Sequence, residues 1–439
     1  MIMKPFTNEI LPQGYKMTEL GALPKEWKVV RLEECLELLR NGITKEQNKL
    51  YKGFPVSRIE TISTGKINIK KIGYIDNLSD DEIEKYRLKE GDILFSHINS
   101  EPYLGNSVIY ENEPKTFIHG MNLLLFRVKA EILDAKFLNF LFNYYRNKGV
   151  FLQIASRSVN QSSINQGKIK TLPIPLPPLP EQQKIAAVLS AVQEAKEKTE
   201  AVIAATKALK KSMMKHLFTY GPVSPQEAEN VPLKETEIGS VPEEWEVVRL
   251  GEIGNIITGN TPSKNIKEYW EKGEIEFIKP PDLQNQKIVT FSEKISNSAV
   301  IKARIVHQGT ILVSCIGIIG RVGLSQKSIA FNQQINAIVP NENIYNHFLF
   351  YAIQVQQKQI ENLASFTTVP IVSKAKFSTV KIPLPPLPTQ QKIASILSAI
   401  DEKIEAEENK KKALEELFKS LLHDLMTAKI RVNQLEISS

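Results

Sequence analysis

Cysteine and long apolar runs are both scarce in this sequence. The 439 residues hold two cysteines, Cys35 and Cys315. They fall at unmatched positions of the two halves described below, so we expect no disulfide framework and a reducing, cytoplasmic setting. No apolar run approaches the ~18 residues of a transmembrane helix. The N-terminal stretch MIMKPFTNEILPQG lacks the apolar region of a signal peptide.

The signatures of common catalytic sites are also missing. There is no phosphate-binding G-x-x-x-x-G-K-[ST] loop and no Asp/Asn-Pro-Pro-aromatic motif, because KPPDL at 279–283 lacks both ends of it. The six histidines show no metal-ligand spacing, and no nucleophile elbow of a Ser-His triad occurs. The glycines of GIIGRVG at 317–323 favour a turn between strands. We therefore expect no catalytic residues, no cofactor and no metal.

The charge balance is mildly basic. The formal net charge is +7 and the sequence pI is about 9.0. Such a balance favours a polyanionic partner such as nucleic acid, although a basic protein that binds none has the same composition.

What the chain does contain is a duplication. TELGALPKEWKVVRL, from Thr18 to Leu32, matches TEIGSVPEEWEVVRL, from Thr236 to Leu250, at about ten of fifteen positions. Further on, PLPPLPEQQKIAAVLSAV from Pro175 is echoed by PLPPLPTQQKIASILSAI from Pro383. Each half thus has an opening segment, a body and a proline hinge that leads into a long helix. The two bodies show little likeness in sequence, which suggests one task performed on two different targets.

Each hinge is followed by apolar residues three and four positions apart, the spacing of a helix with one narrow apolar seam. Each helix is predicted to run about 37 residues, roughly 55 Å. Two matched seams in one chain predict an antiparallel pair with a globular body at each end. The prolines are predicted to end a strand and set the angle of the helix. Gln182 and Gln390, in the two first turns, are either solvated surface or a repeated contact with another subunit. The predicted seams are Ile185, Leu189, Val192, Val202, Thr206, Leu209, Met213 and Leu217, and Ile393, Leu397, Ile400, Ile404, Leu414, Leu417, Leu421 and Leu425.

Both bodies mix short β-rich runs with turns and short helices, so their predicted class is α+β with a curved sheet. Trp27 and Trp245, at equivalent places, are predicted core anchors. Asn and Gln can pair with adenine, and Arg and Lys with guanine, so polar residues of the turns are candidates for DNA contact. These candidates are Arg58, Ser96, His97, Asn99, His119, Asn122, Arg157, Asn160 and Gln161 in the first body, and Lys264, Lys279, Ser314, Arg321, Asn332, Gln333 and Thr367 in the second.

Taken together, these features resemble the specificity subunit of type I restriction-modification systems. The resemblance spans nearly the whole chain. It rests on E-x-G-x-x-P-x-E-W in both halves, on TGNTPSK followed by EYW and GEIEFI, and on PLPPL followed by QQKIA before both helices. Thr389 departs from it, because an acidic residue matching Glu181 is expected there.

The resemblance implies a division of labour. Each body is expected to be a target recognition domain that reads half of a split, asymmetric site in double-stranded DNA. The helices are expected to separate the half-sites and to dock two methyltransferase subunits, which restriction and translocase subunits join. The expected boundaries are a first recognition domain at 1–172, a first hinge and helix at 173–219, a linker at 220–235, a second recognition domain at 236–380, and a second hinge and helix at 381–439.

Two alternatives remain open at this point. One is an enzyme, a methyltransferase or nuclease whose motifs are not recognisable. The other is a coiled-coil scaffold that binds proteins but no DNA. Binding of S-adenosylmethionine would favour the first alternative, and indifference to the loss of Lys264 and Arg321 would favour the second.

Overall fold

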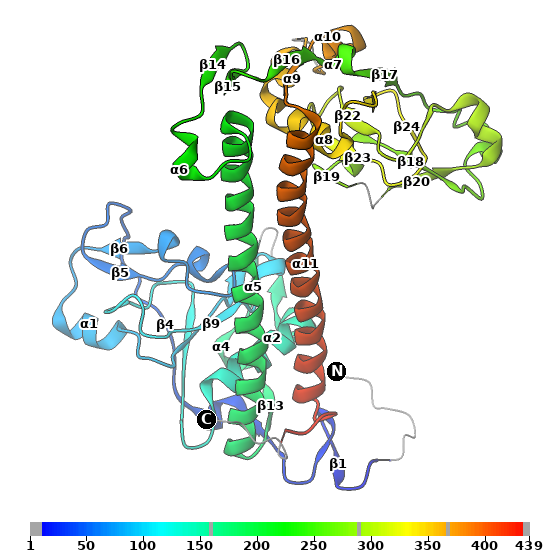
Figure 1. The fold of residues 1–439 in the computed structure, drawn as a ribbon. Coiled ribbons are helices and arrows are strands. Elements are labelled where there is room, and N and C mark those ends of the chain that lie inside the picture. Colours follow the sequence, from blue (N-terminus) through cyan, green and yellow to red (C-terminus); the bar gives the residue numbers. More distant parts are fainter. Residues whose placement is uncertain (1–10, 158–160, 288–290, 366–368, 433–439) are drawn as a thin grey trace. The chain divides into compact units, whose positions relative to one another are not determined.

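The chain divides into two compact units in a computed structural model that describes residues 11–157, 161–287, 291–365 and 369–432 (Figure 1). The first unit comprises Met1–Thr199 and Lys410–Ser439, and the second comprises Glu200–Asn409. Each unit therefore holds one β-rich body, the N-terminal half of one long helix and the C-terminal half of the other. The part of the chain that the structure describes has no helix both long and apolar enough to cross a membrane.

The two long helices are α5 (Leu179–Tyr220) and α11 (Leu387–Met426). They contain 42 and 40 residues, so they extend about 63 and 60 Å. Both are slightly longer than predicted because they begin inside the proline motif. Pro180 and Pro388 lie in the first turns, where a missing backbone N–H costs no helical hydrogen bond.

Within each unit the two helix halves run antiparallel, as predicted. In the second unit, the Nζ atoms of Lys207 and Lys210 lie 2.6 Å from carboxylate oxygens of Glu408 and Asp401, respectively. Residue numbers thus rise along α5 while they fall along α11. In the first unit, Leu189 of α5 shares a core with Leu422 and Leu425 of α11.

The predicted seams are only partly right. Ile185, Leu189 and Leu217 on α5 are buried, but Val202 and Leu209 are 40% and 52% exposed. Ile203 is buried in place of Val202. On α11, Leu417 is 46% exposed. A strict seam of every third or fourth residue drifts around a long straight helix, so some of its members leave the contact.

The proline hinge ends a strand, as expected. β13 (Pro173–Leu176) pairs antiparallel with β3 (Lys28–Arg31), and β26 (Lys381–Leu384) pairs in the same way with β16 (Glu246–Arg249). In both units the long helix begins three residues after the strand ends. A strand of each opening segment therefore pairs with the last strand of the same body. This pairing explains why the opening segment and the hinge are repeated together.

Gln182 and Gln390 follow neither of the two alternatives considered for them. Gln182 is buried, accepts a hydrogen bond from the backbone N–H of Asp134 at 2.9 Å and donates to Pro177 O at 2.8 Å. Gln390 repeats this with the N–H of Tyr345 and with Pro385 O, both at 2.9 Å. Each glutamine fastens its long helix to the body inside one unit.

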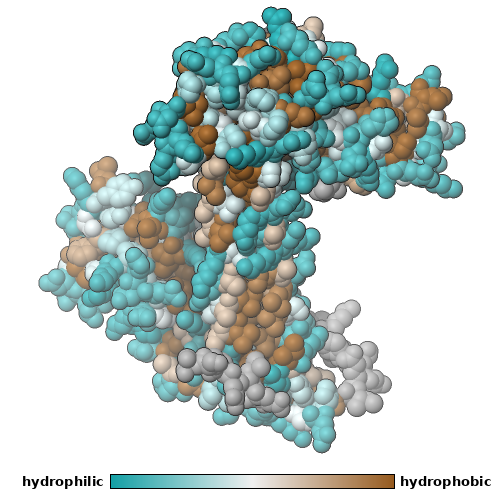
Figure 2. Space-filling model, viewed as in Figure 1, coloured by the Kyte–Doolittle hydropathy of each residue, from teal (hydrophilic) through white to brown (hydrophobic). Residues whose placement is uncertain are grey.

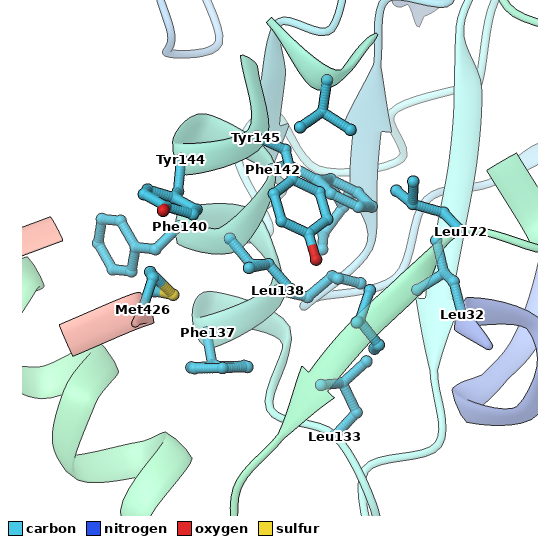
Figure 3. Packing of buried hydrophobic residues seen from close by; sticks show 14 of the residues in the cluster. Leu32, Leu133, Phe137, Leu138, Phe140, Phe142, Tyr144, Tyr145, Leu172 and Met426 are labelled. Atoms are coloured by element: carbon cyan, nitrogen blue, oxygen red, sulfur yellow. The ribbon is translucent and has the colours of Figure 1, made fainter. Parts of the chain in front are cut away.

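The first body is built on a four-stranded sheet in the order β4-β10-β7-β9. Helix α2 (Ala135–Asn147) covers it. Asp134 caps α2 by accepting the N–H of Phe137. The apolar face of α2 packs with the sheet and with Met426 of α11 (Figure 3). The four strands are β4 (Leu36–Asn41), β7 (Ile93–Phe95), β9 (Ser107–Ile109) and β10 (Leu124–Val128).

The second body holds a five-stranded sheet in the order β17-β25-β22-β23-β19 and a four-stranded sheet in the order β20-β18-β24-β21. Helix α8 (Asn346–Val355) shares a core with the first of these sheets. The strands are β17 (Gly254–Thr258), β18 (Ile275–Ile278), β19 (Gln286–Lys287), β20 (Glu293–Ile295), β21 (Ile305–Val306), β22 (Ile311–Ser314), β23 (Val322–Leu324), β24 (Ile329–Phe331) and β25 (Ile335–Pro340).

The remaining predictions about the core are confirmed. Trp27 and Trp245 are 0% and 1% exposed. Cys35 and Cys315 are free, buried thiols that belong to different units. Each Trp follows a short hairpin, β1–β2 (Tyr15–Thr18 and Gly21–Pro24) or β14–β15 (Leu233–Thr236 and Gly239–Pro242).

Candidate nucleic-acid interface

The candidate residues of the first body gather at one end of its sheet. Phe95, the last residue of β7, pairs with Leu124, the first of β10, and Leu124 pairs in turn with Asn41, the last of β4. The loops that leave and enter these three strands therefore meet at this end. They carry the candidates Ser96, His97, His119 and Asn122.

A small three-stranded sheet holds three further candidates at the same end. Its order is β11-β12-β8, with bounds Ser156–Arg157, Ser162–Ser163 and Ile98–Asn99. Ser162 pairs with both Asn99 and Arg157, and the exposed Gln161 precedes it. Asn99 Nδ2 donates to Ser96 Oγ at 3.0 Å, while the exposed guanidinium of Arg157 lies 3.0 Å from Glu101. Asn99, Arg157 and Gln161 thus come together on one sheet.

Arg58 and Asn122 meet in a pocket of about 480 Å³. The segments around Ser57 and Gly120 approach closely beside this pocket, and Ser57 Oγ accepts the N–H of Gly120 at 2.9 Å. A Cβ atom on Gly120 would lie 1.9 Å from Ser57 O, so only glycine fits there. The other residues that line the pocket are Lys45, Glu46, Gln47, Ile59, Glu60 and Met121.

The two histidines of this group are buried. Burial lowers the pKa of His97 to about 4 and that of His119 to about 3, so both rings are neutral near pH 7. His119 Nε2 bonds Leu123 O at 3.1 Å. In the described part of the chain, Nδ1 of each ring has no partner. Both rings are buried beneath the loops at this end of the sheet. Direct contact of either ring with a base stays a prediction.

In the second body the candidates again gather at one end of the sheet. Ser314, the last residue of β22, pairs with Ile335, the first of β25, and the N–H of Cys315 donates to Gln334 O at 2.8 Å. The loop with Asn332 and Gln333 therefore lies beside the hairpin turn of residues 315–321. Thr261 Oγ1 donates to Gln333 Oε1 at 2.6 Å, which brings the TGNTPSK loop to the same end.

Lys264 and Lys279 share one carboxylate. Lys264 Nζ lies 2.5 Å from Glu293 Oε2 and 3.2 Å from the centre of the Trp270 ring, while Lys279 Nζ binds Glu293 Oε1. The two lysines hold the pKa of Glu293 below its ordinary value, against the effect of its partial burial. The carboxylate of Asp282 also belongs to this cluster, because it accepts the backbone N–H of Lys279 at 2.8 Å, so two positive charges stand beside two negative ones.

The two sheet ends are built alike, which the sequence did not reveal. The backbone carbonyl of Ser96 accepts the N–H of Gly105, and its backbone N–H donates to Asn106 O, both at 2.8 Å. Ser314 does the same with Gly320 and Arg321 at 2.9 Å. Both glycines have φ of +80°. The two bodies, which show little likeness in sequence, thus share backbone contacts at this end of the sheet.

Further pairs follow from this correspondence. The carbonyls of His97 and Cys315 accept the N–H of Ile164 and Val372 at 2.8 Å, and those of His119 and Phe331 accept the N–H of Ile43 and Asn260. A Cβ atom on Gly42 would lie 2.0 Å from Gly120 O, and one on Gly259 would lie 2.1 Å from Asn332 O. These contacts fix the same loops in both bodies.

Arg58 in the first body and Lys279 in the second occupy equivalent positions. Each lies two residues after a residue that pairs in parallel, Val56 with Ile118 and Phe277 with Ala330. Each also precedes a short 3₁₀ helix, η2 (Ile59–Ile62) or η6 (Pro280–Asp282). The backbone N–H of each donates to the side chain three residues on, at 2.9 and 2.8 Å. Their correspondence follows from strand pairing and is not visible in the sequence.

The other candidates are distributed as follows. Ser96, Ser314 and Asn332 are buried, and the structure shows them bracing loops, as when Ser314 Oγ accepts the N–H of Arg321 at 2.9 Å. Asn122, Arg157, Gln161, Lys264 and Gln333 are exposed, and Arg58, Asn99, Lys279 and Arg321 are half-buried. Asn160 and Thr367 lie outside the described residues. For all of them, contact with DNA stays a prediction.

Comparison with known proteins gives this fold a family. The profile described as "Type I restriction modification DNA specificity domain" matches residues 24–205 and again 242–416. A putative type I restriction enzyme specificity subunit of Methanocaldococcus jannaschii, MjaX, is 39% identical over 426 residues, which cover 96% of this chain and 97% of that one. A second specificity subunit of that organism, MjaVIII, is 27% identical and covers 97% and 99%.

Solved structures agree on the fold. The crystal structure of the type I S subunit from M. genitalium superposes with a TM-score of 0.61 at 19% identity, covering 91% of this chain and 96% of that one. A structure from a study of type I complex assembly gives 0.53 at 22% identity. The chain belongs to the family of type I restriction-modification DNA specificity subunits. Its α+β architecture, with two recognition domains, a pair of long antiparallel helices and an internal repeat, is that of the family.

Proposed function

We propose that this chain selects the DNA sequence on which a type I restriction-modification complex acts, and that each body reads one block of a two-part asymmetric site in double-stranded DNA. The observation that carries the proposal is the repeated sheet end. The same backbone contacts support different side chains in the two bodies, so one mode of docking is combined with two different base preferences.

The exposed and half-buried polar side chains of the two sheet ends suit this role. Asn99, Arg157 and Gln161 in the first body and Arg321 and Gln333 in the second are of the types that pair with base edges in the major groove. Arg58 and Lys279, at matching places, are candidates for phosphate contacts, because such contacts set the register of a protein on DNA but carry no sequence information. The net charge of +7 favours binding to the DNA backbone.

The long helices are the proposed docking surface for two methyltransferase subunits, to which restriction and translocase subunits would bind in turn. Leu209 of α5 and Leu417 of α11 occupy matching positions of the repeat and are both about half exposed. Figure 2 shows apolar side chains at the surface in the lower part of the view, where the C-terminal half of α11 lies. One exposed leucine per repeat offers each methyltransferase subunit an equivalent contact. The chain itself contributes DNA selection and no chemical step.

The test is an adenine methylome of cells that express this chain together with the methyltransferase subunit of the same host, compared with cells that lack this chain. We expect a new split motif, two short blocks around a fixed gap. A soluble complex that adds no methylation, or that methylates a single continuous block, would contradict the proposal. A chain with Leu209→Asp and Leu417→Asp is the matched control, and it is expected to lose the methyltransferase subunits while both bodies stay folded.

A further inference from the structure

At matching positions, the sheet end of the second body exposes aliphatic side chains where the first body has polar ones. The apolar residues that the first body exposes in these loops, Tyr103 and Met121, stand at other positions. Ile318, at the tip of the β22–β23 hairpin, is 48% exposed. Gly317 and Gly320, with φ of +76° and +80°, shape the turn that presents it. In the first body, the residues that follow the equivalent strand are the polar Asn99 and Ser100.

Two more aliphatic side chains belong to this end. Ile316 bridges Ile371, and the N–H of Gly317 donates to Pro370 O at 3.0 Å, so residues 369–371 run alongside the hairpin. Val369 and Ile371 are exposed. The first body has the same arrangement, since Ile98 pairs with Ser163. The counterparts of Val369 and Ile371 there are Gln161 and Ser163, both polar.

The geometry points to a specific role for Ile318: it contacts the C5-methyl group of a thymine, so that the block read by the second body contains a fixed A·T pair. This inference rests on the proposed function. The thymine methyl is the apolar feature that base pairs present in the major groove, and Ile318 lies at the tip of the turn between β22 and β23, at the end of the sheet. Exposed aliphatic surface is unfavourable in water and gains when a methyl group covers it.

Several observations favour DNA over a protein as the occupant. The aliphatic residues lie on the sheet end that also carries the half-buried Arg321 and the exposed Gln333, so they continue a surface with base-reading chemistry. Cys315 N–H donates to Gln334 O at 2.8 Å, which ties the hairpin directly to the Asn332–Gln334 loop. The neighbouring loop, joined to Gln333 through Thr261, presents the ammonium group of the exposed Lys264, which suits a phosphate backbone better than an apolar protein surface.

The experiment uses the complex of the full chain with the methyltransferase subunits of its host, and duplex DNA that carries the motif found in the methylome. Each thymine of the motif is replaced in turn by deoxyuridine, which lacks only the C5-methyl group. Affinity is measured by competition in fluorescence anisotropy. For the native chain we expect about a fourfold weaker Kd at one thymine or more, the worth of roughly one buried methyl group.

Variants tie the effect to one residue. Ile318→Ala is expected to bind thymine DNA about fourfold more weakly than the native chain and to ignore the change to uridine at the sensitive position. Ile318→Met, which keeps the apolar surface, is expected to keep the sensitivity. Val339→Ala is the matched control, because Val339 is 36% exposed and lies near the far end of β25. Thermal unfolding of each variant shows that the fold is retained.

Three results would overturn the inference. One is specific binding by the native chain with no effect of uridine anywhere in the motif, which leaves the proposed function standing. Another is an Ile318→Ala chain that keeps the full sensitivity to uridine. A third is an Ile318→Ala chain that loses its methyltransferase subunits with unchanged DNA preference, which would make the patch a protein contact. If no split motif appears in the methylome, the proposed function fails first and the inference falls with it.

Discussion

In the first body, the loop that leaves the central strand begins Ser96-His97-Ile98-Asn99, and in the second it begins Ser314-Cys315-Ile316-Gly317. The backbone of both loops makes the same hydrogen bonds at nearly the same distances. The side chains differ at two of these four positions, where His97 and Asn99 are replaced by Cys315 and Gly317. Loop position and loop chemistry are therefore separable in this fold, because main-chain contacts fix the former and leave the latter free to change.

The largest effect on the shared backbone contacts is expected from changes at the two glycines where neighbouring backbones touch. Gly42→Ala and Gly259→Ala each place a Cβ atom about 2 Å from a carbonyl oxygen, so the strands must separate. We expect each change to lower the free energy of unfolding by about 3 kcal/mol, the upper end of typical overpacking costs. Urea unfolding followed by tryptophan fluorescence measures this. Gly251→Ala, whose Cβ would lie 3.1 Å from the Cβ and 3.3 Å from the carbonyl O of Ser378, is the control and should cost less. Unequal costs at Gly42 and Gly259 would show that the two frames differ in rigidity.

A smaller effect is expected from the matched basic residues. Arg58→Ala and Lys279→Ala remove a positive charge from the same place in each body. Each should weaken binding to all DNA sequences about tenfold and reduce the salt dependence of log Kd by about one unit, as loss of a phosphate contact does. Lys279 should have the weaker effect, because Glu293 lies closer to it than Glu60, at 3.4 Å, lies to Arg58 Nε, and so neutralises more of its charge. Lys234→Ala, on the hairpin β14–β15, is the control. A changed base preference instead of a uniform loss would make these residues base readers.

The smallest expected effect is a difference between the two bodies in how their stability depends on pH. His119 has a folded pKa of about 3, far below the ordinary value of about 6.5 expected for the unfolded chain. Between these values the unfolded chain binds more protons, so stability must fall as the pH is lowered through this window. Phe331 occupies the matching place and does not titrate. His119→Phe should therefore reduce the drop in melting temperature between pH 7.5 and pH 5 by a few degrees. An unchanged drop would assign the acid sensitivity to other groups.

The features that could be predicted from the sequence are those that repeat or that depend on neighbours in the chain. The two hinges, the two long helices, the buried Trp27 and Trp245 and the turn at GIIGRVG follow from local patterns. The candidate residues gather at the sheet ends because they were chosen from the turns that flank predicted strands. The equivalence of Arg58 and Lys279 could not be predicted, because it is defined by strand pairing and not by similar neighbouring residues.

The misses have a common physical origin. Gln182 bonds the backbone of Asp134, 48 positions earlier in the sequence, so no local pattern separates it from a surface glutamine. The exposed Leu209 and Leu417 fit the period of the seam, yet the pairing of the helices excludes them. In each case the outcome depends on a contact between distant segments, which a periodicity does not encode.

A cluster around Trp27 has a further consequence for how the chain is made. Trp27 Nε1 donates to Glu181 at 3.0 Å, and Arg431 binds both Glu181 and Glu26 at 2.7 Å. Residues that complete the first unit are thus synthesised only after the whole of the second unit. The second unit is one continuous stretch, Glu200–Asn409, and has all its parts earlier. Although domains usually fold in order from the N-terminus, here the second body has all its parts first, and the first body can close only after Arg431 has been added.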